Sequence, residues 1–341
     1  MFVRWTFCVL LVLVVLLTAC WGSLALWYQG PGGAVLRGVI STAWMVFALV
    51  LIAVGWSRHS GLPFGLYALA FATLLAWWTT IAPSNHRDWA DDVSRSLTGN
   101  VDGQVVTLHN VRNFNWRSEE DYDIRWETRR YDLDHLTSAD LILSSWGMPG
   151  IVHALVSFGF DDGSHAVFSV EVRRQRNQSF SSIGGFFKHF ERIIVAADER
   201  DIIRVRTNVR GETDHLYHLQ MDKPAMRALF LSYVRGANEL AAKPAFYNTV
   251  TSNCVTIVYD MAKQIDPGLP YDYRLLVTAR LPSYLYEVGA LDRHYPLEVL
   301  ISQGDITARA RAAGPNDDFS RAIRTASSAG AAEVAHRDRV P

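Results

Sequence analysis

Apolar residues are concentrated at the start of the chain, and the remainder is polar and mixed. Three stretches, residues 7–27, 39–56 and 62–81, contain no charged side chain and consist mainly of Leu, Val, Ala, Phe and Trp. Each approaches the roughly 20 residues that a helix needs to cross the hydrocarbon core of a bilayer. Tryptophans lie near several of their ends, where amphipathic rings prefer the membrane surface. The pattern therefore predicts a membrane region, residues 1–83, with three transmembrane helices.

The charges that flank these helices give a small signal for orientation. Arg4 precedes the first span and Arg58 lies in the second loop, whereas the first loop holds Arg37. Placing two arginines rather than one in the cytoplasm follows the positive-inside rule. With three spans, the rest of the chain then lies outside the bacterial inner membrane, in the periplasm.

A competing interpretation concerns Cys20. Residues 17–20, Leu-Thr-Ala-Cys, match the cleavage site of a lipoprotein signal peptide after a long apolar segment. Residues 21–28 stay apolar, however, whereas a mature lipoprotein usually continues with a polar tether. In both interpretations the second and third spans form a hairpin, and the large domain lies on the same side of the membrane.

Beyond Pro83 the composition changes abruptly. Residues 84–103 are predicted to be a linker, because charged residues and asparagine follow the last span directly. Residues 104–292 are predicted to form a folded domain that is long enough to bury a good core. Residues 293–341, which become rich in Ala, Arg, Gly and Ser, are predicted to be a mostly disordered C-terminal extension.

The expected elements of the folded domain are strands first and helices later. Runs of β-branched residues separated by turn residues predict hairpins, and Asp222 followed by Pro224 is typical of a helix start. The predicted strands are residues 105–109, 125–133, 151–160, 165–173, 190–197 and 201–207, and the predicted helices are residues 224–241 and two that follow Cys254 and Pro282. This order is typical of an α+β fold with a mainly antiparallel sheet.

Charge and motifs exclude several kinds of ligand. The 341 residues carry a net charge of −1, and the sequence has neither a phosphate-binding glycine loop nor histidines with the spacing of a zinc site. We therefore expect no metal, no cofactor and no nucleic-acid partner.

Arginines gather in residues 112–130 and again in residues 200–210. Ion pairs with nearby acidic residues are the favoured interpretation. The alternative is a site for a phosphate or an anionic head group, because guanidinium forks suit phosphate. Arg112, Arg204 and Arg206 are the candidates for that substrate-binding role.

Phenylalanines surround a Gly-Gly pair in residues 180–190, at Phe180, Phe186, Phe187 and Phe190. Core packing is the favoured interpretation of this segment. The alternative is a mobile apolar lip that contacts acyl chains.

Cys254 is the only cysteine outside the first apolar segment. In an exported domain a lone thiol is a hazard unless it is buried or reactive. Cys254 follows a polar turn and opens a predicted helix, whose dipole and free amide donors favour the thiolate. The alternative is a small buried hydrophobic side chain.

His153 is the best candidate for the base that such a thiol needs. A three-residue loop at residues 161–163 would set a hairpin register in which His153 faces Glu171 and Gly159 faces His165. Opposed residues lie about 5 Å apart, whereas His165 would be roughly 20 Å from His153. Glu171 is therefore predicted to orient the imidazole, on the condition that the loop has three residues.

A sheet histidine followed well downstream by Asn-Cys on a helix looks like the circularly permuted papain-like fold. Residues 153–163 resemble the histidine strand of lecithin:retinol acyltransferase-like proteins. Six further segments, residues 109–114, 126–132, 168–173, 195–201, 204–208 and 247–256, resemble the Lnb N-terminal periplasmic domain family. The resemblance implies an α+β, circularly permuted papain-like domain.

What the resemblance implies chemically is acyl transfer. Lnb is a bacterial lipoprotein N-acyltransferase that moves an acyl chain from a phospholipid to the N-terminal amine of a lipoprotein. Cys254 would then hold the acyl group as a thioester, with His153 as base and Glu171 as its orienting carboxylate. Asn253 and the Cys254 amide are weaker candidates for oxyanion donors, and Tyr247 and Asn248 are weaker candidates for substrate binding.

Two other functions stay open at this point. One is a cysteine hydrolase of the same fold, either a cell-wall peptidase or amidase, or a lipid deacylase. The other is a non-enzymatic envelope module that binds a lipid or a protein partner. A transferase differs from a hydrolase in accepting an amine rather than water, and the sequence does not report on that choice.

Overall fold

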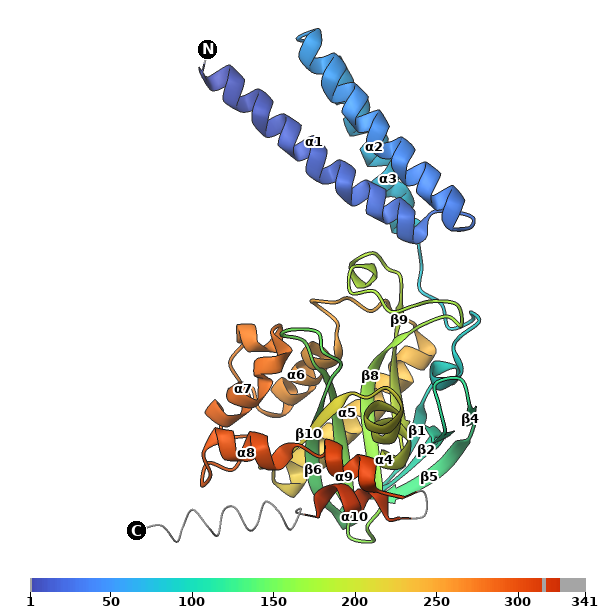
Figure 1. Ribbon diagram of the computed structural model, residues 1–341, viewed down its shortest axis with the longest axis vertical. Coiled ribbons are helices and arrows are strands. Elements are labelled where there is room, and N and C mark those ends of the chain that lie inside the picture. Colours follow the sequence, from blue (N-terminus) through green and yellow to red (C-terminus); the bar gives the residue numbers. More distant parts are fainter. Residues whose placement is uncertain (1, 315–316, 326–341) are drawn as a thin grey trace. The chain divides into compact units, whose positions relative to one another are not determined.

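The computed structural model describes residues 2–314 and 317–325 and divides into two compact units (Figure 1). The membrane unit comprises residues 1–84, 179–191 and 246–249, and the sheet unit comprises the remaining segments. Two short segments that lie far along the sequence thus belong to the same unit as the apolar N-terminal region.

The membrane unit contains the three predicted helices. They are α1 (Phe2–Gln29), α2 (Ala34–Ser57) and α3 (Leu62–Thr80), and all three are long and apolar enough to cross a membrane. Thr18 and Tyr67 join α1 to α3 through a 2.8 Å hydrogen bond between their hydroxyl groups. Helix α1 runs without a break past Cys20, whose lipidation stays an alternative.

The sheet unit is built on an eight-stranded sheet with the order β1-β2-β9-β8-β7-β6-β10, in which β5 also pairs with β2. The strands are β1 (Thr98–Asp102), β2 (Val105–Arg112), β5 (Trp126–Asp132), β6 (Leu136–Ser145), β7 (His153–Phe160), β8 (His165–Arg173), β9 (Glu191–Ala197) and β10 (Thr213–His218). A separate pair is formed by β3 (Asn115–Trp116) and β4 (Tyr122–Asp123). The α+β class is confirmed.

The sheet is mixed rather than purely antiparallel. Most neighbouring strands pair antiparallel, as predicted, but β9 pairs parallel with β2 at Arg112 and Ala197. The parallel pair arises because the chain inserts β9 between β2 and β8, which are not consecutive in the sequence. The circularly permuted papain-like order stays a prediction.

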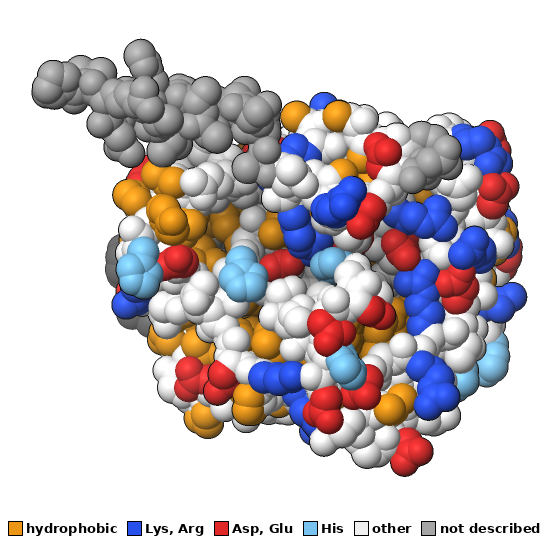
Figure 2. All heavy atoms as spheres, turned by 90° about the horizontal axis from the view of Figure 1, so that it is seen from below, with side chains coloured by type: hydrophobic (Ala, Val, Ile, Leu, Met, Phe, Trp, Pro, Cys, Tyr) orange, Lys and Arg blue, Asp and Glu red, His pale blue; other side chains and the backbone are white. Residues whose placement is uncertain are grey.

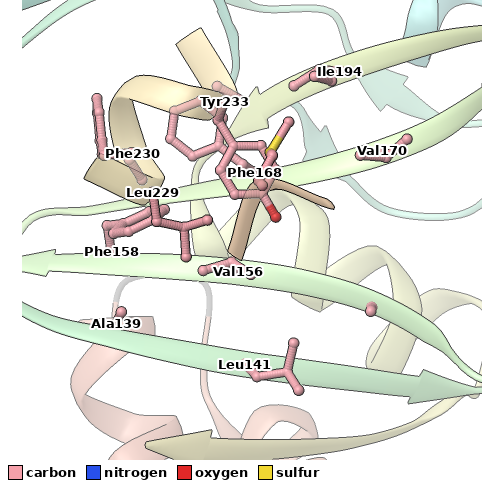
Figure 3. Packing of buried hydrophobic residues seen from close by; sticks show 14 of the residues in the cluster. Ala139, Leu141, Val156, Phe158, Phe168, Val170, Ile194, Leu229, Phe230 and Tyr233 are labelled. Atoms are coloured by element: carbon pink, nitrogen blue, oxygen red, sulfur yellow. The ribbon is translucent and has the colours of Figure 1, made fainter. Parts of the chain in front are cut away.

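Helices cover both faces of this sheet. On one face, α5 (Lys223–Ala242) and α6 (Cys254–Ile265) pack against alternate residues of the central strands. Figure 3 shows the centre of this core, where Phe158 and Phe168 face Phe230 and Tyr233 of α5. The ring centroids of Phe168 lie 5.0 Å from Phe230 and 4.9 Å from Tyr233, within the range of favourable aromatic pairs.

The segment that the sequence predicted to be mostly disordered contributes to both faces: Leu297 and Leu300 of its first helix pack on the core just described, and its later helices cover the opposite face. After α7 (Leu281–Glu287), the chain forms α8 (Leu297–Gly304), α9 (Thr307–Ala312) and α10 (Phe319–Arg324). Ile306, Ala310, Phe319 and Ile323 are buried in a second core with α4 (Glu199–Arg204). The prediction was wrong for this part because helices of six to eight residues are too short to show a periodic pattern. Residues 326–341 lie outside the described residues.

Two further boundaries differ from the prediction. The predicted linker, residues 84–103, contributes strand β1 and buries Trp89, Val93 and Leu97, so the folded unit begins earlier than residue 104. Residues 201–207 are not a strand but lie in α4 and the π-helical turn η4 (Val205–Val209). Asp198 caps α4 by accepting a hydrogen bond from the Arg200 amide, and this local signal outweighs the β-branched composition.

Arg324 offers a test of the C-terminal helices. Its guanidinium lies 2.7 Å from Asp140 and 2.7 Å from Glu199, and both carboxylates are almost fully buried. Arg324→Met removes the cation that Glu199 and Asp140 share and leaves Asp140 with His218 alone, so we expect a loss of about 3 kcal/mol in the free energy of unfolding. The thermal midpoint of the detergent-solubilised protein should fall by roughly 6–12 °C. Arg321→Met, an exposed arginine on the same helix, is the control; equal midpoints for the two variants would contradict the assignment.

Candidate active site

The β7–β8 hairpin has the predicted register. Leu155 pairs with Ser169 and Gly159 with His165. The Phe160 amide donates to the Ser164 carbonyl, and Gly163 has a φ of 81°, which an L side chain rarely adopts. The three-residue loop is therefore confirmed, and continuing this register places residue 153 opposite residue 171.

His153 and Glu171 meet across this hairpin. The Nε2 atom of His153 lies 3.1 Å from Oε1 of Glu171 and 2.7 Å from the Ser169 hydroxyl. Ser169 also donates to Glu171 at 2.8 Å. The side chains of His153 and Glu171 are 13% and 17% exposed, so the contact is largely shielded from water. The predicted pairing is thus present in the structure.

Glu171 also forms an ion pair with a buried arginine. Arg206, in the turn η4, donates from Nη2 to Oε1 of Glu171 at 2.8 Å. Its Nη1 lies 3.5 Å from Glu212, and Arg206 itself is buried. Arg206 was predicted as a candidate for substrate binding, and that role stays a prediction. Its observed contacts are those of a residue that fixes the carboxylate beside His153.

Two buried carboxylates complete this network. The Ser144 hydroxyl is 2.5 Å from both Glu212, which immediately precedes β10, and Asp214, the second residue of that strand. Burial, together with the charge of Glu212, raises the pKa of Asp214 to about 7, although Ser144 and Arg206 oppose the shift. Glu212 and Asp214 were not among the predicted site residues. The available signal was two acidic residues separated by one position at the start of a strand. This pattern is too common to identify Glu212 and Asp214 as site residues.

Cys254 is the first residue of α6, as predicted, and its side chain is buried. Asn253 caps the helix: its Oδ1 accepts hydrogen bonds from the amides of Val255 and Thr256, each at 2.9 Å. The Thr256 hydroxyl in turn accepts from the Asn253 amide, which completes a capping box. The capping box fixes the start of the helix and hence the position of the thiol.

The thiol interacts with the start of strand β7. Cys254 shares a hydrogen bond with His153 and accepts another from the Ala154 amide. Burial raises the pKa of the Cys254 thiol, but the charge and hydrogen bond of His153 outweigh it, and the pKa falls below its ordinary value. Three residues from three separate stretches, Cys254, His153 and Glu171, therefore meet at one place.

The same charges act on the imidazole. Burial alone would lower the pKa of His153, but Glu171 and Cys254 reverse this and raise it to about 10. Burial opposes ionisation of Glu171, yet His153 and Arg206 hold the pKa of its carboxyl well below the ordinary range. These shifts favour an imidazolium at His153 and a carboxylate at Glu171, and they move the thiol toward its thiolate form. This is the charge pattern of an activated cysteine nucleophile.

Two of the remaining candidates, Arg112 and Arg204, have partners outside this cluster. Arg112 is buried in an ion pair with Asp201 at 2.9 Å. Arg204 donates to the carbonyls of residues 313 and 314 and lies over the ring of Phe319. Tyr247 and Asn248 belong to the membrane unit, whereas Cys254 belongs to the sheet unit. Their predicted roles in substrate binding stay predictions, as does that of Asn253 in an oxyanion site.

Ion pairing accounts for much of the arginine clustering. Arg117 pairs with Asp121 and Asp123, and Arg129 pairs with Glu127 and Asp198. On the face of the protein shown in Figure 2, basic and acidic side chains likewise lie next to one another. The favoured interpretation of the arginine-rich stretches is therefore supported at these residues.

Comparison with protein families agrees with the resemblance seen in the sequence. Residues 122–279 match the family model of the Lnb N-terminal periplasmic domain, and this span contains His153, Glu171, Arg206 and Cys254. No curated protein and no solved structure matches the chain. Three apolar helices precede the matched domain, so the protein is anchored in the inner membrane with this domain in the periplasm.

The charge pattern predicts how Cys254 reacts with a small alkylating agent. Thiolate persists to a lower pH than in an ordinary cysteine, because the pKa of Cys254 is lowered by His153. His153→Ala removes that cation and leaves burial to raise the pKa, so alkylation at neutral pH should slow by about tenfold or more. Mass spectrometry of the peptide that holds Cys254, after treatment with iodoacetamide, measures the rate. His165→Ala, at the other end of the hairpin, should react like the unaltered protein; equal slowing in both variants would contradict the pairing.

Proposed function

Because residues 122–279 match the family model of the Lnb N-terminal periplasmic domain, we propose that the protein is a membrane-anchored thiol acyltransferase of the periplasm. It would move an acyl chain from a phospholipid to the N-terminal amine of a lipoprotein. The observation that carries the proposal is the buried contact of Cys254 with His153, which Glu171 keeps protonated.

The first half-reaction begins from the ion pair. The Cys254 thiolate attacks the carbonyl carbon of a phospholipid ester, and the carbonyl oxygen takes the negative charge. As the tetrahedral intermediate collapses, the C–O bond to glycerol breaks and the His153 imidazolium gives its proton to the leaving alkoxide. The products are a Cys254 thioester, neutral His153 and a lysophospholipid.

The helix start supplies donors for the oxyanion. Asn253 uses its Oδ1 to accept from Val255 and Thr256, and the Cys254 amide is not among the groups that it caps. An amide at the first position of a helix, aided by the dipole, suits a negatively charged oxygen. In this proposal the Cys254 amide is the oxyanion donor, and Asn253 orients it through the cap.

The second half-reaction restores the ion pair. Neutral His153 accepts a proton from the lipoprotein α-amine as the amine nitrogen attacks the thioester carbonyl. The C–S bond then breaks, the acyl group stays on nitrogen as an amide, and Cys254 leaves as a thiolate. Glu171 stabilises the imidazolium that forms again, since the carboxylate remains ionised beside it.

Burial of the reacting groups favours an amine over water as the acceptor. Cys254 is 7% exposed, and the imidazole is also largely covered. A thioester persists until its acceptor arrives only if water is kept away. The runner-up function is a hydrolase on the same cysteine, in which water replaces the amine in the second half-reaction.

An assay with both substrates tests the proposal. Detergent-purified protein is incubated with a phospholipid and a synthetic diacylated lipopeptide that has a free N-terminal amine, and products are read by mass spectrometry. We expect the lipopeptide to gain one acyl chain in a reaction that Cys254→Ala abolishes. Release of lysophospholipid and free fatty acid, with an unmodified lipopeptide, would show a hydrolase instead. No change in either substrate would argue against both.

The roles of His153 and Glu171 are separable in the same assay. His153→Ala should lower the rate by about 10²–10⁴, the usual contribution of a general acid–base. Glu171→Gln should cost less, roughly tenfold, and should move the loss of activity at high pH downward from about 10, because the imidazolium loses its carboxylate. Rates at several pH values, with thermal midpoints to check folding, measure both effects. An unaltered pH profile for Glu171→Gln would remove Glu171 from the mechanism.

A further inference from the structure

The aromatic loop, residues 179–190, connects β8 to β9 and belongs to the membrane unit. It packs on the end of α1 that the proposed orientation places at the periplasmic surface. The Tyr28 hydroxyl lies 3.0 Å from that of Ser181, and Gln29, the last residue of α1, donates to the carbonyls of Phe187 and Lys188 at 3.0 and 2.6 Å. The loop is therefore held at the depth where this helix leaves the membrane.

The end of α3 holds the same loop. Lys188 donates from Nζ to the carbonyls of Trp78 and Ile81 and lies over the indole ring of Trp78. The Phe187 ring packs between those of Tyr28 and Trp78, with centroid distances of 5.7 and 6.3 Å. Lysine and tryptophan are residues that mark the membrane surface, so both contacts place the loop there.

The close approach of the loop depends on its two glycines. A Cβ atom on Gly184 would lie 3.1 Å from the ring of Tyr28 and 3.0 Å from that of His189, and one on Gly185 would collide with Thr249. A side chain on Gly185 would therefore displace Thr249, and one on Gly184 would require Tyr28 or His189 to shift by a few tenths of an ångström.

Three large apolar side chains of this anchored loop are exposed. Phe180 is 49% exposed, Ile183 is 55% exposed and Phe186 is 47% exposed. Trp27, near the same end of α1, is also 44% exposed. Apolar side chains that are grouped and exposed mark a surface for a membrane or a partner. Here the group adjoins helix surfaces that are themselves covered by lipid.

We propose that the aromatic loop is a membrane-inserting element that buries Phe180, Ile183 and Phe186 in the boundary between head groups and acyl chains. Side chains of this kind enter that boundary by about 5–10 Å in peripheral membrane segments. Lipid acyl chains are the occupant that fits, because the loop is fastened to two helix ends at the membrane surface.

The insertion has a consequence for the nucleophile. Residues 246–249 lie against the loop: the Tyr247 amide donates to the Phe190 carbonyl at 2.9 Å, and the Thr249 hydroxyl donates to the Ser182 carbonyl at 2.8 Å. This segment ends five residues before Cys254. The loop therefore holds residues 246–249 at the membrane surface, where acyl esters lie, and only a short stretch of sequence separates them from Cys254. Only this consequence rests on the proposed acyl transfer; the insertion does not.

Depth-dependent quenching tests the insertion. The full chain, carrying Cys8→Ala, Cys20→Ala and Cys254→Ala, receives a single cysteine as Ile183→Cys, Phe186→Cys or the control Val101→Cys. Val101 is an exposed apolar residue on β1 in the sheet unit. Each cysteine is labelled with an environment-sensitive fluorophore, and the protein is placed in vesicles of phosphatidylethanolamine and phosphatidylglycerol that contain nitroxide-labelled lipid.

We expect a nitroxide near the top of the acyl chain to quench the labels at positions 183 and 186 about threefold more than the label at 101. Equal quenching at all three positions would overturn the proposal. An apolar emission that lipid nitroxide does not quench, and that grows with protein density, would also overturn it in favour of a second copy of the chain.

A functional arm separates this proposal from the proposed activity. Phe186→Ser should lower acyl transfer from vesicle phospholipid by about tenfold, while Val101→Ser should not. The alkylation rate of Cys254 in detergent should be unaltered in Phe186→Ser, since the thiol and its histidine are untouched. Lipid quenching without acyl transfer in the unaltered protein would keep the loop assignment and reject the transferase. Acyl transfer without lipid quenching would support the transferase and reject the membrane insertion of the loop.

Discussion

A carboxylate that is withdrawn from water must be matched by positive charge, and at Glu171 this requirement brings several parts of the fold together. Its Oε1 atom lies 3.1 Å from His153 on the neighbouring strand and 2.8 Å from Arg206 on the turn η4. Leaving such a buried charge without a partner would cost several kcal/mol. The hairpin register and the placement of η4 are both needed to avoid that cost. The same charge keeps His153 protonated, and the protonated imidazole in turn favours the Cys254 thiolate.

Groups of alternating charge therefore form a series that begins with buried residues of the domain and ends at the thiol of Cys254. Arg206 is itself balanced by Glu212, which shares the Ser144 hydroxyl with Asp214. Because these groups are buried and compensate one another, water does not have to stabilise the ion pair at the surface. In the proposed reaction, such a site would be charged before substrate binds, so that little reorganisation would be required when charge moves.

How much of this was predictable depends on the sequence distance between partners. The contact of His153 with Glu171 follows from the length of one loop, because pairing in a hairpin is fixed by its turn. The N-terminal position of Cys254 on its helix follows from the polar turn before it. The contact of Arg206 with Glu171 could not be predicted, because it depends on the turn η4. The β-branched residues around Arg206 had led to the prediction of a strand there. The C-terminal helices were not predicted for a related reason. Their apolar residues, such as Ile306 and Phe319, can be recognised as core residues only when the sheet face that they cover is known.

The phenylalanines around Gly184 and Gly185 had two interpretations, core packing and contact with lipid, and the structure separates the buried members of the group from the exposed ones. Phe187 and Phe190 are buried, the former between aromatic rings at the ends of the membrane helices. Phe180 and Phe186 remain exposed from the same loop. The burial of Phe187 and Phe190 fixes the loop, and the positions of Phe180 and Phe186 are therefore fixed as well. In a freely moving loop, the exposed rings would indicate no particular depth in the membrane. In the proposed insertion, the contacts of the loop with the helix ends set the level at which Phe180 and Phe186 meet the bilayer.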